Sequence, residues 1–329
     1  MKKGKYNKIS DVSGILVGHK TLSDGDTQTG VTVILPRKDI FRQKCPAAAH
    51  VINGFGKTSG LIQIEELGTL ESPIALTNTL SVGTVQQALV KHMLKENQEI
   101  GFSTGTVNVV VGECNDGYLN AIRSCAVTEA DVYEAIDDAK EDFALGSVGA
   151  GTGMSCFEMK GGIGSSSRLL SIGRQTYTLG ALVLSNFGKK QDFRFEHNAF
   201  SSCQDTAPEQ GSIMIILATD LPLSSRQLKR MCKRTSAALA RIGSWLGNGS
   251  GDIAIAFSTG NTIRHDDLNA IQLMQILNEN YMDLVFRATI EACEEAILSS
   301  LKYAETVIGR DEHIRYSLKD TLQQMKEKD

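Results

Sequence analysis

Ser212 stands at a junction where a serine could act as a nucleophile. Upstream, residues 188–211 are polar and show no apolar period, which predicts a loop that ends at Gly211. Downstream, residues 213–217 form a continuous aliphatic run with β-branched residues, which predicts a strand buried on both faces. A serine there can use a histidine base, or its own α-amine if the chain is cut before it. The same pattern also fits an ordinary Gly-Ser turn, so spacing alone leaves both interpretations open.

Three other predicted strands carry polar residues at their ends, where a rigid element could hold them for chemistry. Glu113 follows the apolar residues 107–111, and Asn186 follows the apolar residues 181–184. Ser250 and Asp252 stand at the start of a strand predicted over residues 253–257. Taken alone, Glu113 also fits a solvated turn carboxylate and Asn186 a turn-initiating asparagine. These residues are candidates for a site around Ser212.

Strands alternate with helical patterns along the chain. Apolar residues recur at three- and four-residue steps over residues 82–94 and 228–242, which predicts two amphipathic helices. A longer helical pattern covers about residues 268–307 with a break near residues 278–280, and the charged residues 319–329 predict a frayed tail. Interleaved strands and helices indicate a layered α/β or α+β domain. No linker separates two self-sufficient cores, so we expect residues 1–329 to form a single domain.

The composition is that of an ordinary globular protein. The chain has 329 residues, of which 41% are hydrophobic and 22% are charged, and its net charge is −4. It has no basic block or aromatic-interleaved basic stripe, so nucleic acid is not an expected partner. No apolar run approaches the roughly 20 residues of a membrane-spanning helix, and no signal-peptide apolar region follows the basic start. We therefore expect a soluble, cytoplasmic protein without a membrane partner.

Histidine and cysteine spacing argues against metal chemistry. Six histidines lie far apart and form no H-E-x-x-H or H-x-x-x-H pair, which disfavours a zinc enzyme. Seven cysteines are scattered without a C-x-x-C pair, which is typical of reduced intracellular thiols. Residues 51–58 resemble a phosphate-binding loop but begin with Val51, and residues 149–153 lack the flanking strand and helix of a dinucleotide site. We expect no metal and no cofactor.

A family resemblance rests on two segments, residues 211–223 and 247–259, and on a series of shorter motifs. The shorter motifs are residues 17–19, 24–26, 29–32, 53–56, 112–113, 115–117, 149–154 and 160–164. Together they resemble the DmpA family of self-processing serine aminopeptidases, the L-aminopeptidase/D-esterase and β-aminopeptidase group. The motifs span nearly the whole chain in the family's order, which argues against a chance match.

The resemblance implies a four-layer α-β-β-α sandwich of the type that the DmpA family shares with ornithine acetyltransferases. It implies autocatalytic cleavage between Gly211 and Ser212 into residues 1–211, the α chain, and residues 212–329, the β chain. These products would stay associated in a homo-oligomer, a tetramer of αβ pairs. The expected substrates are small peptides and amino-acid amides or esters, from which the enzyme would release the N-terminal amino acid.

The resemblance also implies roles for the candidate residues. Ser212 would attack the Gly211 carbonyl during processing. Its freed α-amine, with an ordinary pKa of about 7.7–8.0, would then serve as the base during hydrolysis. Asn186 would donate a hydrogen bond to the oxyanion. Glu113 would bind the amine of the substrate, which makes the reaction an aminopeptidase reaction.

Ser250 and Asp252 would orient the hydroxyl and amine of Ser212, although some relatives have glutamate where this chain has the shorter Asp252. Three other interpretations stay open. The first is a transacylase of the ornithine-acetyltransferase type, against which Ser212 argues because that type uses a threonine nucleophile. The second is a non-catalytic binding protein that keeps the fold. The third is a conventional amidase that works from the uncleaved chain.

Overall fold

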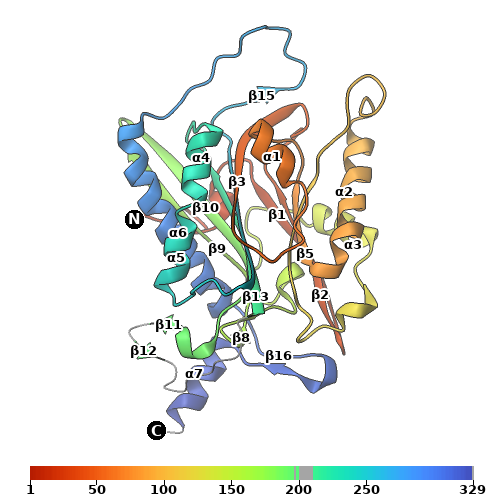
Figure 1. The fold of residues 1–329 in the computed structure, drawn as a ribbon, viewed down its shortest axis with the longest axis vertical. Helices are drawn as coiled ribbons and strands as arrows, with labels where there is room; N and C mark the ends of the chain where they lie inside the picture. Colours follow the sequence, from red (N-terminus) through yellow and green to blue (C-terminus); the bar gives the residue numbers. More distant parts are fainter. Residues whose placement is uncertain (196–197, 200–209, 328–329) are drawn as a thin grey trace.

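Two β-sheets face each other, and helices cover both outer sides (Figure 1). The computed structural model describes residues 1–195, 198–199 and 210–327. In this part of the chain the smaller sheet contains, in spatial order, β1 (Leu16–Asp24), β2 (Thr27–Leu35), β5 (Ile74–Asn78) and β6 (Val110–Cys114). The larger sheet contains β15 (Ile263–Arg264), β3 (Gln43–Gly54), β14 (Gly249–Ser258), β13 (Gln210–Thr219), β10 (Gln175–Asn186) and β9 (Gly162–Ile172), and β4 (Thr69–Leu70) pairs with β3.

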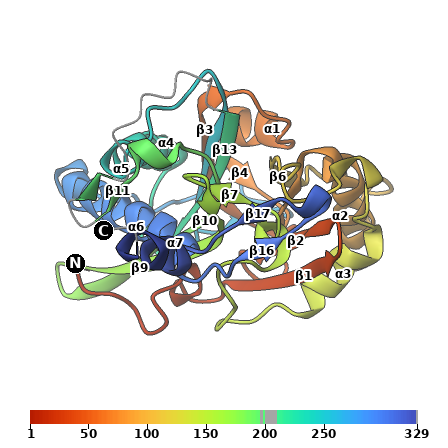
Figure 2. The same ribbon diagram turned by 90° about the horizontal axis from the view of Figure 1, so that it is seen from below.

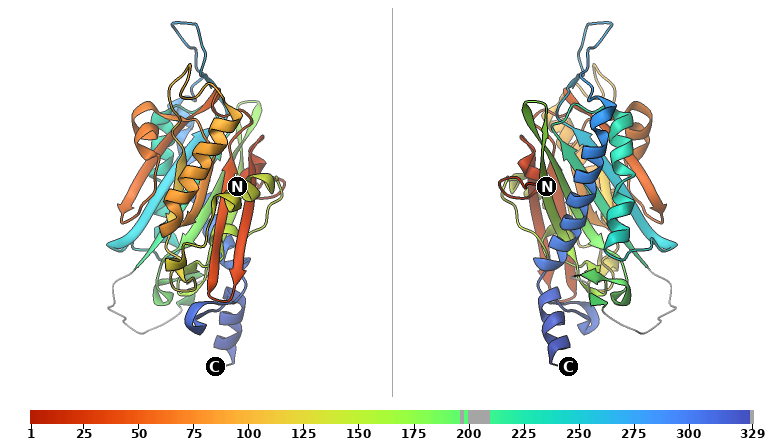
Figure 3. Two further views of the ribbon diagram at one scale, coloured as in Figure 1. Left: turned by 90° about the vertical axis from the view of Figure 1, so that its right-hand side faces the viewer. Right: turned by 90° about the vertical axis from the view of Figure 1, so that its left-hand side faces the viewer.

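The helices form the two outer layers, which Figure 3 shows from either side. The smaller sheet is covered by α2 (Val82–Glu96) and α3 (Glu129–Asp137). The larger sheet is covered by α4 (Ser225–Cys232) and α6 (Met282–Lys302), with α5 (Thr235–Arg241) packed beside α6. Two shorter helices, α1 (Leu61–Leu67) and α7 (Leu318–Lys326), contact β3 and α6 respectively. The order helix, sheet, sheet, helix is the predicted α-β-β-α sandwich.

The strand that carries Ser212, β13, runs through the middle of the larger sheet and is buried on both faces. Met214 and Ile216 pack in the core between the sheets, whereas Ile213 and Ile215 pack in the core under α4 and α6. This alternation explains why the predicted strand is aliphatic at every position. Because β13 already begins at Gln210, the Gly211–Ser212 peptide bond lies inside the strand. By the same alternation, the Ser212 side chain is on the face toward the smaller sheet.

Short hairpins gather at one end of the sandwich (Figure 2). One hairpin pairs β7 (Ser155–Cys156) with β8 (Met159–Lys160), and another pairs β11 (Arg194–Phe195) with β12 (Asn198–Ala199). The third pairs β16 (Val307–Ile308) with β17 (Ile314–Arg315). We call residues 307–315 the C-terminal arm. The backbone N–H of Lys160 donates to the Tyr316 carbonyl at 2.8 Å, which fixes the end of the arm against the β7–β8 hairpin.

Two predictions near the C-terminus are wrong in part or in full. Of the helical pattern expected over residues 268–307 with a break near residues 278–280, the part after the break forms α6 from Met282 to Lys302. The part before the break is not helical, because Leu268 and Leu273 are almost fully exposed and find no core to pack against. The tail expected to fray forms α7, because the Ser317 side chain accepts a hydrogen bond from the Asp320 N–H and Leu318 is buried. Of the predicted loop 188–211, residues 196–197 and 200–209 lie outside the described residues.

Candidate active site

A cavity of about 780 Å³ lies where the ends of β6 and β10 meet the start of β13. Ser212, Asn186 and Glu113, which the sequence places more than 20 residues apart, line it together with Gly211. Ser250 and Asp252 are buried next to this cavity but do not line it. A volume of this size falls within the roughly 300–1,000 Å³ of small-ligand sites, which is room for a short peptide.

Ser212 is held from both sides by neighbouring strands. It pairs with Asn186 on the antiparallel β10 and with Gly251 on the parallel β14, and it is 4% exposed. The residue before it must be small, since a Cβ atom on Gly211 would lie 2.7 Å from Phe187 Cα and 2.8 Å from the Asn186 carbonyl oxygen. The Gly211–Ser212 bond is therefore packed closely against the end of β10.

Cys114, a second side chain of a nucleophilic type, lies beside Ser212 but has low reactivity. Burial, reinforced by the charge of Glu113, raises the pKa of the Cys114 thiol well above its ordinary value, although hydrogen bonding to the Ser212 side chain opposes the shift. The thiol donates to the Leu184 carbonyl at 3.5 Å. A neutral, fully buried thiol is a poor nucleophile. Ser212 is therefore the better placed of the two for attack.

Glu113 is buried with neutral partners only. Its Oε1 atom accepts the Lys57 backbone N–H at 2.8 Å, and its Oε2 atom accepts the Thr79 hydroxyl. The side chain is 3% exposed. Within the described part of the chain, no lysine, arginine or histidine nitrogen lies within 4.0 Å of this carboxylate. From the sequence, Glu113 is expected at the end of a strand, where taken alone it also fits a solvated turn carboxylate; in the structure β6 extends to Cys114 and buries Glu113 within the strand.

Asn186 is fixed by two backbone groups. Its Oδ1 atom accepts the Ser155 N–H at 2.8 Å, and its Nδ2 atom donates to the Asn115 carbonyl at 2.9 Å. An amide nitrogen carries two hydrogens, so one remains for another acceptor. These partners come from segments 31 and 71 residues away along the chain. The side-chain amide therefore has a defined orientation at the edge of the cavity.

Ser250 and Asp252 form a pair of their own at the start of β14. The Ser250 hydroxyl donates to Asp252 Oδ1 at 2.7 Å, and both side chains are almost fully buried. In the β13–β14 register they stand opposite Gly211 and Ile213. Strand alternation puts them on the face opposite to the Ser212 hydroxyl, while the Ser212 nitrogen lies in the plane of the sheet between the two faces.

Several cavity residues were missed by sequence reasoning. Lys57, Tyr118, Arg310 and Arg315 all line the cavity. Tyr118 follows the motif of residues 115–117 directly, and this position was the signal that could have revealed it. The arginines carry no local signal, because the C-terminal arm reaches the cavity only through the fold.

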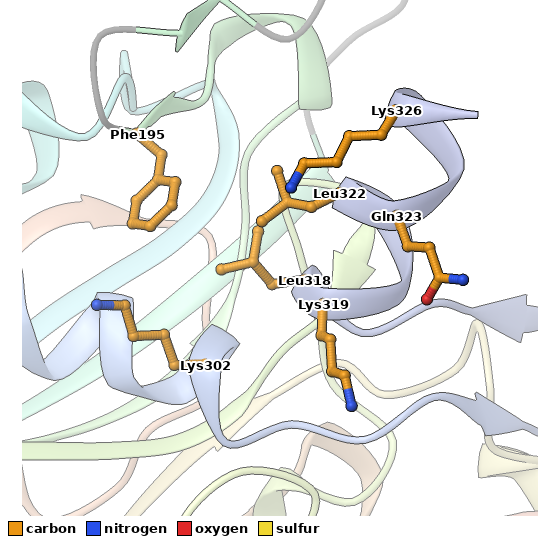
Figure 4. Close-up of a pocket in the computed structure, with 7 residues that line it drawn as sticks. All are labelled: Phe195, Lys302, Leu318, Lys319, Leu322, Gln323 and Lys326. Atoms are coloured by element: carbon orange, nitrogen blue, oxygen red, sulfur yellow. The ribbon is translucent and has the colours of Figure 1, made fainter. Parts of the chain in front are cut away.

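A second hollow of about 550 Å³ lies between α7, the end of α6 and Phe195 (Figure 4). Lysines and leucines dominate its lining, which contains no carboxylate and no nucleophile, so it is not the candidate active site. Among the described residues, no three histidine, cysteine or acidic side chains are grouped to hold a metal ion. In the same part of the chain, every helix is too short or too polar to cross a membrane.

Comparisons with known proteins identify the family of this chain. The profile of Peptidase family S58 matches residues 7–315. Beta-peptidyl aminopeptidase BapA from Sphingosinicella microcystinivorans is 35% identical over 338 residues, which cover 94% of this chain and 84% of that protein.

Solved structures give the same result. The PH0078 protein from Pyrococcus horikoshii OT3 superimposes with a TM-score of 0.92 and 48% identity, covering 99% of this chain and 96% of that one. The L-aminopeptidase D-Ala-esterase/amidase from Ochrobactrum anthropi, a prototype of the serine aminopeptidases with a variant Ntn-hydrolase fold, gives 0.89 and 33% over 99% and 96% of the two chains. This chain therefore belongs to peptidase family S58, as an aminopeptidase with a serine nucleophile.

Proposed function

We propose that this enzyme creates its nucleophile by cutting its own chain between Gly211 and Ser212, and that Glu113 then selects substrates with a free amine. The second part of the proposal is supported by the burial of the Glu113 carboxylate with neutral hydrogen-bond partners among the described residues. A buried carboxylate with only neutral partners is costly until a cation joins it. The ammonium group of a peptide supplies that cation in the same cavity as Ser212.

Self-cleavage would proceed by an N-to-O acyl shift. The Ser212 hydroxyl attacks the Gly211 carbonyl carbon, the peptide C–N bond breaks, and an ester joins Gly211 to Ser212 Oγ. Water then hydrolyses the ester, which leaves a carboxylate on Gly211 and a free α-amine on Ser212. The close packing of Gly211 against Phe187 supports this step, because it holds the scissile bond in place.

In hydrolysis, the free α-amine of Ser212 takes the hydroxyl proton while Oγ attacks the substrate carbonyl. The remaining Nδ2 hydrogen of Asn186 donates to the developing oxyanion, and loss of one such donor typically costs about 100- to 1000-fold in rate. The amine then returns the proton to the leaving group. Water hydrolyses the acyl enzyme, which releases the substrate's acyl group as an acid and restores the Ser212 hydroxyl. We assign Ser250 and Asp252 to the amine and not to the hydroxyl, because strand alternation puts them on the other face of β13.

The two products, residues 1–211 and 212–329, should stay together as one catalytic unit. Strands β13 and β14 from the second product lie between β3 and β10 from the first product, in one hydrogen-bonded sheet. Their separation would expose the aliphatic residues of both cores to water, at roughly 25 cal/mol for each Å² of apolar surface.

We also propose a homo-oligomer of processed pairs, in line with the predicted tetramer. The support is a run of apolar side chains on one exposed segment: Leu268 is 100% exposed, Leu273 is 96% exposed, and Ile271 and Ile276 are largely exposed. Contiguous apolar surface of this kind is typical of a protein interface. For the location we propose the cytoplasm, supported by the described cysteines, none of which is in a disulfide.

An intact-mass measurement combined with a substrate pair tests the proposal. The purified protein should give two fragments, of which the smaller begins at Ser212. Alanyl and β-alanyl p-nitroanilides should be turned over, and their N-acetyl derivatives should lose on the order of 100-fold in kcat/KM, if ~3 kcal/mol of pairing with Glu113 is forfeited. Hydrolysis should survive chelation by EDTA. Equal turnover of the free and acetylated compounds would end the assignment of amine recognition to this cavity.

A further inference from the structure

The C-terminal arm brings two arginines into the cavity that the mechanism above does not use. Arg310 and Arg315 both line the cavity that contains Ser212 and Glu113. The arm reaches this place through backbone contacts with the segment that follows β6. The Arg310 N–H donates to the Leu119 carbonyl at 2.8 Å, and His313 Nδ1 lies 2.9 Å from the Tyr118 carbonyl oxygen.

The guanidinium group of Arg315 is held in one orientation. It lies over the Tyr118 ring, with its central carbon 3.6 Å from the ring centroid, and the same ring stacks on His313 at 4.6 Å between centroids. Arg315 Nε donates to the Ser155 hydroxyl at 3.1 Å. The terminal nitrogens are not engaged by any hydrogen bond to a described residue. Because the guanidinium group stacks on a ring and its Nε atom is hydrogen-bonded, its two terminal nitrogens have a defined orientation and are available to a ligand.

Among the described residues, Arg315 has no acidic partner and Arg310 has one, the exposed Asp311. No carboxylate oxygen of a described residue lies within 4.0 Å of Arg315, and Arg310 has only Asp311, whose Oδ2 is 3.5 Å from Nε. Arg310 Nε is buried and makes no hydrogen bond to a described group. Burial lowers the pKa of Arg315, although Tyr118 and Glu158 oppose the shift. An arginine keeps its charge under such a shift, so the arm presents partly buried positive charge to the cavity.

The arginines and Glu113 reach the cavity from different parts of the fold, the C-terminal arm and β6. Ser155 connects Arg315 to the nucleophile, because its hydroxyl accepts from Arg315 and its N–H donates to Asn186, which pairs with Ser212. Glu113 is held instead by Lys57 and Thr79. A substrate in the cavity therefore has access to a carboxylate and to a guanidinium group that are held by different residues.

We infer that Arg315, assisted by Arg310, binds a carboxylate of the substrate, so that the enzyme prefers short peptides that carry both a free amine and a free acid. Arginine and carboxylate match in two parallel hydrogen bonds, which gives both strength and orientation. The inference rests on the proposed aminopeptidase function. Two substrate carboxylates have the required chemistry: the C-terminal α-carboxylate of a dipeptide and the side chain of an acidic residue.

Two substrate pairs on the processed enzyme test this inference. Alanyl-alanine is compared with alanyl-alaninamide, and glutamyl p-nitroanilide with glutaminyl p-nitroanilide, on wild type, Arg315→Gln and Arg315→Lys. Wild type should favour the acid of at least one pair by about 10- to 100-fold in kcat/KM, mainly through KM, because this contact is remote from the reacting atoms. Arg315→Gln should bring that ratio close to one, and Arg315→Lys should keep part of it.

The substrate pair whose ratio of kcat/KM, acid over amide, falls toward one in Arg315→Gln identifies the carboxylate that Arg315 binds. Arg264→Gln, an exposed arginine outside the cavity, is the matched control and should keep the wild-type ratios. Fragment masses and melting curves show that each variant folds and is processed. Ratios near one in wild type, or ratios unchanged in Arg315→Gln, would overturn the inference while turnover of alanyl-alaninamide leaves the proposed function intact. Failure of wild type on all four compounds would overturn the proposed function itself.

Discussion

Two lining residues of the candidate cavity, which we call its Glu113 end and its Arg315 end, have opposite charges and different surroundings. Glu113 belongs to a strand of the smaller sheet, is 3% exposed, and is fixed by a backbone N–H and a hydroxyl. Arg315 belongs to a short hairpin at the end of the sandwich, is partly exposed, and is fixed by an aromatic ring and one hydroxyl. An unmet charge costs more in the buried setting than in the solvated one. The Glu113 end should therefore act as a strict requirement and the Arg315 end as a graded preference.

The largest effect should come from Ser212, the proposed nucleophile. Ser212→Ala removes the attacking oxygen, so the chain should stay intact and hydrolysis of every substrate should fall by at least about 1000-fold. Mass spectrometry and a p-nitroanilide assay measure the two effects. Ser171→Ala, an exposed serine on β9, is the control. A Ser212→Ala protein that still splits at residue 212 would rule out Ser212 as the processing nucleophile.

Glu113→Gln should have the next largest effect, because it keeps the size of the side chain and removes its charge. We expect a loss of about 100-fold in kcat/KM for alanyl p-nitroanilide and a much smaller loss for the N-acetyl compound. Self-cleavage should continue, since Gly211 has no free amine to bind. Glu158→Gln changes an exposed carboxylate of the same cavity and serves as the matched control. An unchanged preference for the free amine in Glu113→Gln would move amine recognition to another residue.

Salt should weaken recognition at the Arg315 end more than recognition at the Glu113 end. This effect should be smaller than the effects of the two substitutions above. Between 0.1 M and 1 M salt the Debye length falls from about 10 Å to about 3 Å, which weakens exposed charge pairs more than buried ones. The preference for the substrate carboxylate should fall about threefold or more. The preference for the free amine should change by less than about twofold. Kinetic titration with sodium chloride on both substrate pairs measures this, and parallel losses at the two ends would show that they are equally solvated.

The smallest effect on hydrolysis concerns the sheet that carries Glu113. His19 on β1 lies 2.9 Å from the Thr32 hydroxyl and 3.1 Å from the Ala144 carbonyl oxygen through its two ring nitrogens. Burial lowers the pKa of His19 to about 4, although the Ala144 carbonyl and Asp138 oppose the shift. The unfolded chain, with an ordinary pKa near 6.5, binds this proton first. Stability is therefore complete above about pH 6.5 and is lost as the pH falls toward 4.

That loss should amount to roughly 1–3 kcal/mol, or a few degrees in Tm. His19→Gln should flatten the dependence of Tm on pH between 4 and 6.5, and it should leave kcat/KM at pH 8 close to that of wild type because His19 is outside the cavity. Thermal melts across this pH range measure the difference. Parallel curves for His19→Gln and wild type would remove His19 from the acid sensitivity of the sheet.

Local sequence pattern determined much of the fold. The aliphatic residues 213–217 predict a strand buried on both faces, and the structure has β13 there with its side chains shared between two cores. The period of residues 82–94 predicts α2. The same method fails at residues 268–278, where apolar residues suit a helix but none forms in the absence of a packing surface. Periodicity reports what a segment could bury, and the rest of the chain decides whether it does.

The sequence by itself also indicated the nucleophile: a small residue, a serine and a predicted buried strand are neighbours in the chain, and the family resemblance favoured a nucleophilic Ser212 over an ordinary Gly-Ser turn. Only the tertiary structure decided how the other groups act. The separation of Glu113 from the described lysines, arginines and histidines depends on the burial of β6 at the edge of the smaller sheet, and the orientation of Asn186 depends on Ser155 and Asn115. Arg315 reaches Tyr118 across 197 residues of chain. Charge and hydrogen bonding act over a few ångströms of space, so residues far apart in sequence acquire their chemistry only when the sheets have assembled.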